Sequence, residues 1–317
     1  MNCEKAGSMK GIYFDGKKAV YREDLPMPVP ESRESLISVR MAAVCSTDRE
    51  ILRGYRPDFT GVMGHEFVGM VEESPDSSLV GKTIVGELNA ACGKCIYCRT
   101  GRPTHCTYRR VLGMHQKDGC FEEYMTIDTA LIHQVPEGLP VEKAIYTEPL
   151  AAAFEIMTQM SFSDDENIAV LGDGRLAYCV VQAFVSKGYK VTVLGKHPEK
   201  LKLFEPYAEV SLERQKEAYE VVVEATGSPD GIRQAFDLVR KKGTIILKST
   251  YAGEVSLPLS LVAVNEITII GSRCGPFAPA LDALSSGRAQ FPDITVFSPK
   301  EFEQAFGFTG FKAGFVF

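Results

Sequence analysis

The architecture of this chain is set by IAVLGDGRLAYCVVQAF at residues 168–184. The first four residues are apolar and favour a strand, and the second half has the composition of a buried helix. Between them the pattern Gly172-x-Gly174-x-x-Ala177 is a permissive form of the dinucleotide fingerprint. Gly172 suits the tight turn, Gly174 lets backbone approach a pyrophosphate, and the small Ala177 lets the helix pack on the strand. An ordinary tight turn between a strand and a helix can have the same sequence pattern. The pattern of the surrounding segments must therefore distinguish the two interpretations.

Strands and helices alternate around this stretch. The sequence predicts strands at 168–171, 190–194, 220–223, 244–247 and 267–270, with helices from about 175 to 186, from about 198, and near 228–240. Such alternation is typical of a doubly wound parallel sheet with helices on both faces.

The part of the chain before residue 150 has a different pattern of predicted secondary structure. Short strands separated by turns are predicted at 9–14, 19–22, 36–44, 66–72, 83–88 and 121–127. The C-terminal segment 275–317 combines a predicted short helix with apolar segments. A length of 317 residues favours two domains over one.

The end of the second strand, in KVTVLGKHPEK at 190–200, predicts the choice of dinucleotide. An acidic residue there would hold the ribose hydroxyls of NAD, but this chain has Gly195 followed by Lys196 and His197. Without the carboxylate, and with a cation adjacent, a 2′-phosphate is tolerated or attracted. We predict a preference for NADP over NAD of about tenfold. A solvated loop lysine is the alternative interpretation of Lys196.

A cysteine-rich loop predicts a bound metal. In ACGKCIYCRTGRPTHC the spacing is C-x2-C-x2-C-x7-C, which comprises Cys92, Cys95, Cys98 and Cys106. Four thiolates can close a tetrahedron around a structural Zn²⁺. An iron–sulfur cluster uses the same ligands at related spacings, and four free thiols are the simplest alternative. The N-terminus MNCEKAGSMKGIYF lacks a secretory apolar core, so we expect reduced cysteines and a cytoplasmic location.

A second, dispersed set of residues combines a thiol, an imidazole and carboxylates. Cys45 follows an apolar strand in MAAVCSTD, and His65 and Glu66 stand in GVMGHEF. Such a mixed set suits a catalytic zinc with one open position. Glu148 in TEPLAAA adds a carboxylate just before Pro149. Each residue alone has a plainer interpretation: a buried thiol, a hydrogen-bonded histidine, or an acid at a helix N-terminus.

The charge balance narrows the possible partners. Lys and Arg number 35 against 41 Asp and Glu, for a net charge of −6. No long block of one charge indicates nucleic acid or an anionic membrane surface. No apolar run reaches the roughly 18 residues of a membrane span. We therefore expect a small-molecule partner.

These elements, in this order, resemble the zinc-containing medium-chain dehydrogenase/reductases, the family of alcohol, polyol, sugar and threonine dehydrogenases. The resemblance covers nearly the whole chain, and the segments that carry it are AAVCSTD, GHEFVGMV, ACGKCIYCRTGRPTHC, TEPLAAA, VLGDGRLA, VVVEATG and NEITIIGSR. It implies an α/β protein with a mostly-β GroES-like catalytic domain at 1–150 and 275–317, a structural-zinc lobe at 91–107, and a Rossmann domain at 151–274. A homodimer or homotetramer is also implied.

The resemblance assigns roles to individual residues. Cys45, His65 and either Glu148 or Glu66 would hold the catalytic zinc. Glu66 looks like an exchangeable carboxylate beside the metal. Asp48 is similar to the acid that orients the ligating imidazole. Thr47 matches the hydroxyl residue that relays the substrate proton.

The expected activity is a zinc-dependent transfer of hydride between an alcohol and NAD(P), with one catalytic and one structural zinc per chain. Zinc would lower the pKa of the alcohol as a Lewis acid. A carboxylate ligand favours polyols, sugars or hydroxy-amino acids over ethanol. One alternative is a reductase of an activated carbonyl or alkene that keeps only the structural zinc. Another is a nucleotide-binding relative without turnover.

Overall fold

The computed structural model describes residues 7–251 and 254–317. The chain divides into two compact units, Met1–Glu148 with Phe291–Phe317, and Pro149–Gln290. The second boundary follows Gln290 rather than residue 274, because α9 (Phe277–Ser285) contacts α5 (Arg175–Ser186) within the second unit.

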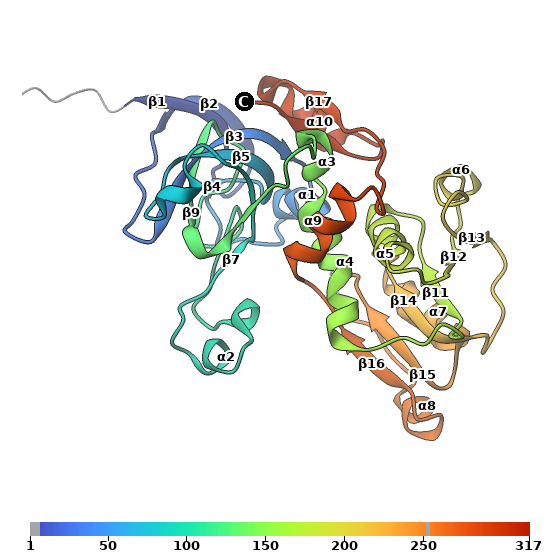
Figure 1. Cartoon of the computed structure of the whole chain (residues 1–317). Coiled ribbons are helices and arrows are strands. Elements are labelled where there is room, and N and C mark those ends of the chain that lie inside the picture. The colour runs from blue at the N-terminus through green and yellow to red at the C-terminus, as the bar shows by residue number, and fades with distance from the viewer. Residues whose placement is uncertain (1–6, 252–253) are drawn as a thin grey trace, which may run out of the picture. The chain divides into compact units, whose positions relative to one another are not determined.

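The second unit is built on a six-stranded sheet in the order β13-β12-β11-β14-β15-β16 (Figure 1). All five neighbouring pairs are parallel, which confirms the predicted doubly wound sheet. Its strands are β11 (Ile168–Leu171), β12 (Thr192–Leu194), β13 (Glu209–Ser211), β14 (Tyr219–Glu224), β15 (Val239–Leu247) and β16 (Thr268–Gly271). The other helices are α4 (Thr147–Gln159), which begins in the first unit, α6 (Pro198–Leu201), α7 (Pro229–Leu238) and α8 (Leu259–Val264).

The apolar pattern explains why these segments form a central sheet. All four residues of β11 are buried, as expected for a parallel strand covered on both faces. Leu171 and Leu194 belong to one buried core cluster with residues of β14, α7 and β15. On α5, nine residues are buried, so this helix packs closely over the sheet.

The first unit is mostly β-structure, as predicted. It holds a three-stranded sheet, β2-β1-β4, and a seven-stranded sheet, β10-β6-β5-β3-β18-β17, with β9 paired to β3. The strands are β1 (Ser8–Phe14), β2 (Ala19–Pro26), β3 (Glu34–Ala43), β4 (Gly61–Val62), β5 (Glu66–Glu73), β6 (Thr83–Gly86), β9 (Tyr124–Asp128), β10 (Ile132–Gln134), β17 (Thr295–Phe297) and β18 (Ala313–Phe315). Since β18 pairs with β3, the C-terminal segment completes the first unit.

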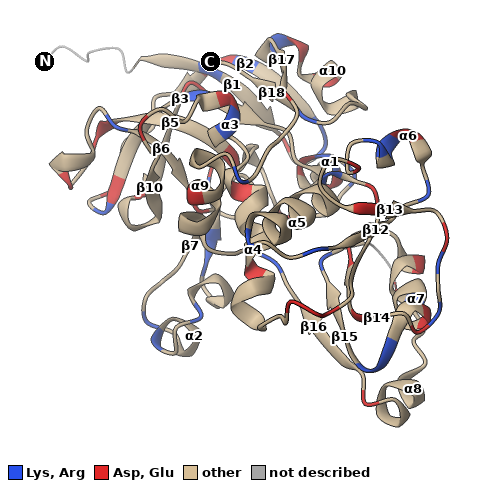
Figure 2. Cartoon of the chain, turned by 45° about the vertical axis from the view of Figure 1, so that its right-hand side comes forward, with Lys and Arg blue, Asp and Glu red and all other residues tan. Residues whose placement is uncertain are grey.

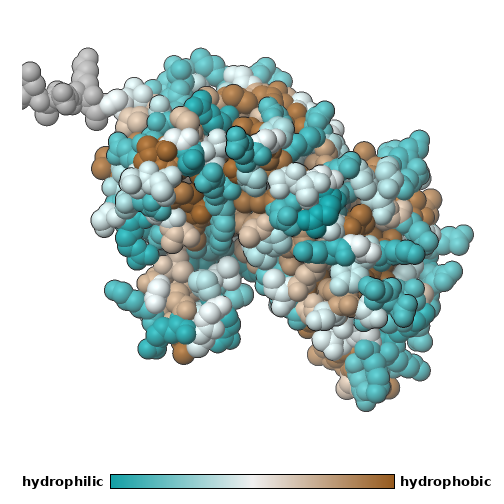
Figure 3. Space-filling model, in the orientation of Figure 1, coloured by the Kyte–Doolittle hydropathy of each residue, from teal (hydrophilic) through white to brown (hydrophobic). Residues whose placement is uncertain are grey.

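A lobe extends from the first unit on a short antiparallel stem of β7 (Asn89–Ala90) and β8 (Arg110–Val111), and α2 (Ile96–Arg99) lies in it (Figure 1). Apolar residues reach the molecular surface at several points, including this lobe (Figure 3). The remaining α-helices of this unit are α1 (Ser46–Leu52), α3 (Val141–Ala144) and α10 (Phe302–Gly307). Short 3-10 turns lie at Ser77–Leu79, Pro103–His105, Thr129–Leu131 and Pro299–Glu301.

Acidic and basic residues are interspersed along both units (Figure 2). This distribution agrees with the modest net charge of the chain. In the described parts of the chain, no helix has the length and hydropathy needed to cross a bilayer.

Candidate metal centres and dinucleotide loop

Pairing of two strands brings the dispersed predicted ligands together. Cys45 is the N-cap residue of α1, directly after β3, while His65 and Glu66 stand where β5 begins. β3 and β5 are antiparallel, with Ala43 opposite Glu66. One ligand atom from each of Cys45, His65 and Glu66 lies within 4.8 Å of the others. The sheet register therefore converts distant sequence positions into one ligand cluster.

Asp48 fixes two members of this cluster. Its carboxylate is fully buried and accepts a hydrogen bond from the Cys45 backbone N–H at 2.8 Å. Its other oxygen lies 3.5 Å from Nδ1 of His65. Burial alone would lower the pKa of His65, but electrostatic interactions and hydrogen bonds with Asp48 and Cys45 raise that pKa well above its usual value. Asp48 thus has the position predicted for an acid that orients the imidazole.

Glu66 has a partner that the sequence analysis missed. Lys312, itself buried, forms an ion pair with Glu66 from the segment just before β18. The only sequence signal was a single lysine among small and apolar residues in GFKAGFVF.

The donor set fits a divalent metal. Asp48 Oδ1 and His65 Nδ1 lie 3.5 Å apart, and Glu66 Oε2 is paired with Lys312, so these three atoms already have protein partners. A thiolate, an imidazole nitrogen and a carboxylate oxygen are ligands of zinc, and three protein ligands leave a position open.

Thr47 and Glu148, two further residues predicted for the site, are not members of this ligand cluster. Thr47 is half-buried on α1, and its Oγ1 lies 3.7 Å from the Cys45 sulfur. Glu148 is the half-buried second residue of α4 and is not part of the ligand cluster. Of the two carboxylates predicted from the sequence, Glu66 is the one that lies in the cluster with Cys45 and His65.

The cysteine-rich lobe forms a second cluster. The sulfurs of Cys92, Cys95, Cys98 and Cys106 all lie within 4.8 Å of one another. Sulfur–sulfur distances are 3.5 Å for Cys95–Cys98, 3.8 Å for Cys95–Cys106 and 4.0 Å for Cys92–Cys98. Zn–S bonds of about 2.3 Å in a tetrahedron place sulfurs about 3.8 Å apart. The four thiols, none of them in a disulfide, therefore fit a closed structural site.

Backbone amides support this cluster. The N–H groups of Lys94 and Cys95 both donate to the Cys92 sulfur at 3.4 Å. Hydrogen bonds from backbone N–H groups lower the pKa of Cys95 to about 6, whereas burial raises the pKa of Cys98 to about 12. The loop thus has donors in place for thiolate ligands.

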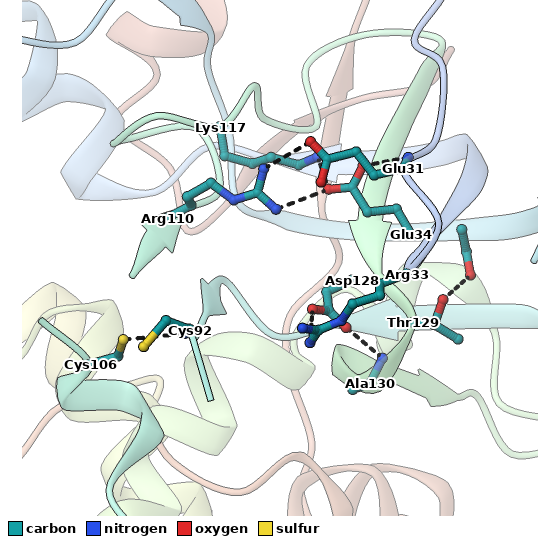
Figure 4. A network of polar contacts seen from close by, with 11 residues as sticks. Glu31, Arg33, Glu34, Cys92, Cys106, Arg110, Lys117, Asp128, Thr129 and Ala130 are labelled. Carbon is teal, nitrogen blue, oxygen red and sulfur yellow. Dashed lines mark hydrogen bonds and ion pairs between the residues drawn. The ribbon is translucent and has the colours of Figure 1, made fainter. Parts of the chain in front are cut away.

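A polar network ties the base of the lobe to the body of the first unit (Figure 4). The buried carboxylate of Glu34 accepts hydrogen bonds from Lys117 Nζ at 2.7 Å and from Arg110 at 3.4 Å. Nearby, Arg33 pairs with Asp128 at 3.1 Å. Because Arg110 begins β8, its contact with Glu34 holds the stem of the lobe.

The glycine loop of the second unit has the geometry of the fingerprint. Gly172 has a φ of +128°, and a Cβ there would lie 2.7 Å from the carbonyl oxygen of Ala225. Gly174 is the N-cap of α5, and a Cβ there would meet no atom within 4 Å. Ala177 is completely buried. The exposed helix N-terminus beside Gly174 is therefore available to a pyrophosphate.

The structure also shows what surrounds Gly195 and Lys196. The carboxylate of Asp173, the residue between the two loop glycines, accepts hydrogen bonds from the backbone N–H groups of Lys196 and His197 at 2.8 and 2.9 Å. The His197 ring lies 2.9 Å from the same carboxylate. Sequence reasoning missed Asp173, although an acid inside the G-D-G pattern was a visible signal.

Comparisons with known proteins agree with this geometry. The family described as alcohol dehydrogenase GroES-like domain matches residues 31–137. The chain is 29% identical over 302 residues to an uncharacterised zinc-type alcohol dehydrogenase-like protein of Haemophilus influenzae, covering 88% of each chain. It is 28% identical to a sorbitol dehydrogenase of Halalkalibacterium halodurans, covering 83% of this chain and 84% of the relative. A zinc-binding dehydrogenase of Sinorhizobium meliloti, solved with NADP, has the same fold with a TM-score of 0.89 at 23% identity, over 98% of this chain and 99% of that one.

Proposed function

Because the chain belongs to the zinc-containing medium-chain dehydrogenase/reductase family, we propose that it transfers hydride between an alcohol and a nicotinamide dinucleotide with the aid of a catalytic zinc. The observation that carries this proposal is the convergence of Cys45, His65 and Glu66 in a chain that also has the glycine loop. A reductase that kept only a structural zinc would not need this convergence. The same cluster, with Thr47 and Asp48 intact, argues against a relative without turnover.

The residues of the first unit have distinct roles in this proposal. Cys45, His65 and Glu66 hold the metal, and Asp48 keeps the His65 ring oriented through the contact at Nδ1. A bound zinc supplies Lewis-acid chemistry that lowers the pKa of an alcohol. The Thr47 hydroxyl, beside the Cys45 sulfur, receives the alcohol proton and passes it toward solvent. Glu148 stays a candidate for exchange with Glu66.

The residues of the second unit bind the dinucleotide. The N-terminus of α5 at Gly174 receives the pyrophosphate, and Ala177 keeps the helix close to β11. Gly195 and Lys196 lie at the end of β12, where the adenosine ribose binds in such folds. The preference for NADP that these two residues predict is part of the proposal, and the Sinorhizobium meliloti structure with NADP is consistent with it.

The substrate class follows from the ligand set. A carboxylate donates less charge to zinc than a second thiolate would, so the metal can accept a further oxygen ligand. A polyol, sugar or hydroxy-amino acid can add a second oxygen donor, and one relative is a sorbitol dehydrogenase. We therefore propose such substrates, with one zinc at each of the two clusters.

Location and assembly complete the proposal. Cysteines arranged as metal ligands favour a reducing compartment, so we place the enzyme in the cytoplasm. β16 is an edge strand, and the preceding α8 exposes Leu259, Leu261 and Val264. This apolar edge supports a homodimer or homotetramer.

A substrate screen tests the proposal. Purified enzyme with zinc is mixed with polyols, sugar alcohols and hydroxy-amino acids, and reduction of NADP and NAD is followed by absorbance. We expect turnover in at least one class, with NADP favoured about tenfold in kcat/KM. Cys45→Ala should abolish turnover and leave dinucleotide binding intact, because the glycine loop lies in the other unit. A fully active Cys45→Ala variant would refute the catalytic-zinc assignment.

A further inference from the structure

We propose that Asp173 determines cofactor specificity by supplying, from the glycine loop, the carboxylate that the end of β12 lacks. In this role it accepts a ribose hydroxyl and opposes a 2′-phosphate. The inference rests on the proposed function, because it presumes that the loop binds a nicotinamide dinucleotide.

The sheet places Asp173 at the required position. β11 and β12 are parallel, and Leu171 is paired with Leu194. The residues that follow, Gly172–Asp173 on one strand and Gly195–Lys196 on the next, therefore leave the sheet side by side. A Cβ added to Gly195 would lie 2.9 Å from Oδ2 of Asp173. The Asp173 carboxylate thus fills the space that an acidic side chain at position 195 would otherwise take.

The surroundings keep Asp173 ionised. Its side chain is only 9% exposed, and burial alone would raise its pKa. Hydrogen bonds from the backbone N–H groups of Lys196 and His197, and from the His197 ring, outweigh burial and lower that pKa. The carboxylate therefore carries its charge at neutral pH. It also occupies the two N–H groups that a phosphate would otherwise use.

The free acceptor capacity of Asp173 suits a ribose. Oδ2 accepts from both backbone N–H groups, whereas the contact of Oδ1 is with the His197 ring at 3.0 Å. A carboxylate oxygen has about two lone-pair sites, so Oδ1 retains capacity for a hydroxyl donor. A 2′-phosphate at the same place would bring a second anion against this charge. Asp173 and Lys196 therefore act in opposite directions on cofactor choice, and the NADP preference proposed above is what remains of the Lys196 effect against the opposition of Asp173.

This arrangement changes what a substitution at Gly195 would do. From the sequence alone, Gly195→Asp would restore the missing acid and reverse the preference. In the structure, the new side chain would meet Asp173 Oδ2 at 2.9 Å and the Leu201 side chain at 2.7 Å. A useful variant must therefore alter Asp173 itself.

The test is Asp173→Asn, which keeps an oxygen for the backbone N–H groups and removes the charge. Dissociation constants of NADH and NADPH are measured for the zinc-loaded protein from the fluorescence of the reduced nicotinamide. We expect the ratio of the NADH constant to the NADPH constant to rise about tenfold, mainly through tighter NADPH binding. Asp164→Asn, in the exposed turn before β11, is the matched control and should leave the ratio unchanged.

Each outcome either supports or overturns the role of Asp173 in cofactor choice. An unchanged ratio of dissociation constants in Asp173→Asn, or an equal loss of affinity for NADH and NADPH, would overturn the inference. A purely structural role of Asp173 would affect the binding of both cofactors alike. If the wild type binds neither cofactor, the proposed function fails together with the inference. Should Asp173→Asn not fold by thermal melting, Asp173→Ser, which retains a short acceptor, takes its place. The double variant Asp173→Ser/Gly195→Asp moves the carboxylate to the strand and should return the ratio toward the wild-type value.

Discussion

The charge of Glu66 in the metal-ligand cluster is balanced by a buried lysine. Removing one partner of a buried ion pair leaves the other charge uncompensated and costs about 3–5 kcal/mol. We therefore expect Lys312→Met to lower the free energy of unfolding by roughly that amount, measured by urea denaturation of the zinc-free enzyme, in which no metal offsets the Glu66 charge. Lys312→Arg should retain most of the stability.

A matched control exists in the same unit. Lys300 pairs with Glu23 at 2.9 Å, but both side chains are more than half exposed. Such pairs contribute about 0–1 kcal/mol, so Lys300→Met should have little effect. Equal losses in Lys312→Met and Lys300→Met would show that the Lys312 charge does not stabilise the cluster.

Individual site residues were predictable from the sequence where they belong to a motif of a few consecutive residues. The cysteine spacing and the glycine loop pointed to Cys92 and Gly172 directly; Cys92 lies in the cluster of four sulfurs, and Gly172 has a positive φ. Partners that come from distant segments were not predictable. Lys312 reaches Glu66 across most of the chain, and Asp173 meets Lys196 only because β11 and β12 are neighbours. Their roles depend on strand order, which no short motif encodes.

At the scale of elements, the cysteine-rich lobe has little secondary structure of its own to hold it together, apart from the polar contacts at its base. Its stem is the two-residue pair β7–β8, and its helix α2 has four residues and no buried side chain. A short helix of this kind is not stable alone. The structural metal should therefore supply most of the folding free energy of the lobe.

Cys98→Ser tests this dependence. We expect elemental analysis to show one zinc per chain instead of two, and proteases to cut within 91–107 faster than in the wild type, because the lobe loses its metal. The Cys45 cluster should keep its zinc. Ser285→Ala, on α9 of the second unit, is a control that should change neither readout. Retention of two zinc ions in Cys98→Ser would contradict the four-thiolate assignment.

The elements were predictable to different extents. Strong apolar runs such as β11 were predicted with the observed bounds, because burial on both faces leaves a clear signal. β15 begins at Val239, five residues before the predicted strand, since its first part, VRKKG, is polar and is defined by pairing with β14. The domain boundary was placed before α9, because nothing in the sequence of α9 indicates that it contacts α5.

On the scale of the whole molecule, the candidate metal sites and the candidate dinucleotide site lie in different units. Both cysteine-containing clusters lie in Met1–Glu148, whereas the glycine loop lies in Pro149–Gln290. Each unit has its own core, and a ligand stabilises the state that binds it by RT ln(1 + [L]/Kd). Zinc and dinucleotide should therefore protect separate parts of the chain.

Hydrogen exchange measured by mass spectrometry shows, peptide by peptide, which part of the chain each ligand protects. Removal of zinc with a chelator should speed exchange in the lobe and around α1 and β5, while β11 and α5 keep their protection. Addition of NADPH at about 100 times its Kd should slow exchange in the second unit, corresponding to about 2.7 kcal/mol. Peptides of β15, far along the sheet from β12, serve as an internal reference for global stabilisation of that unit. If chelation instead exposed β11 and β3 equally, the two units would unfold as one, and the independence of their ligands would be refuted.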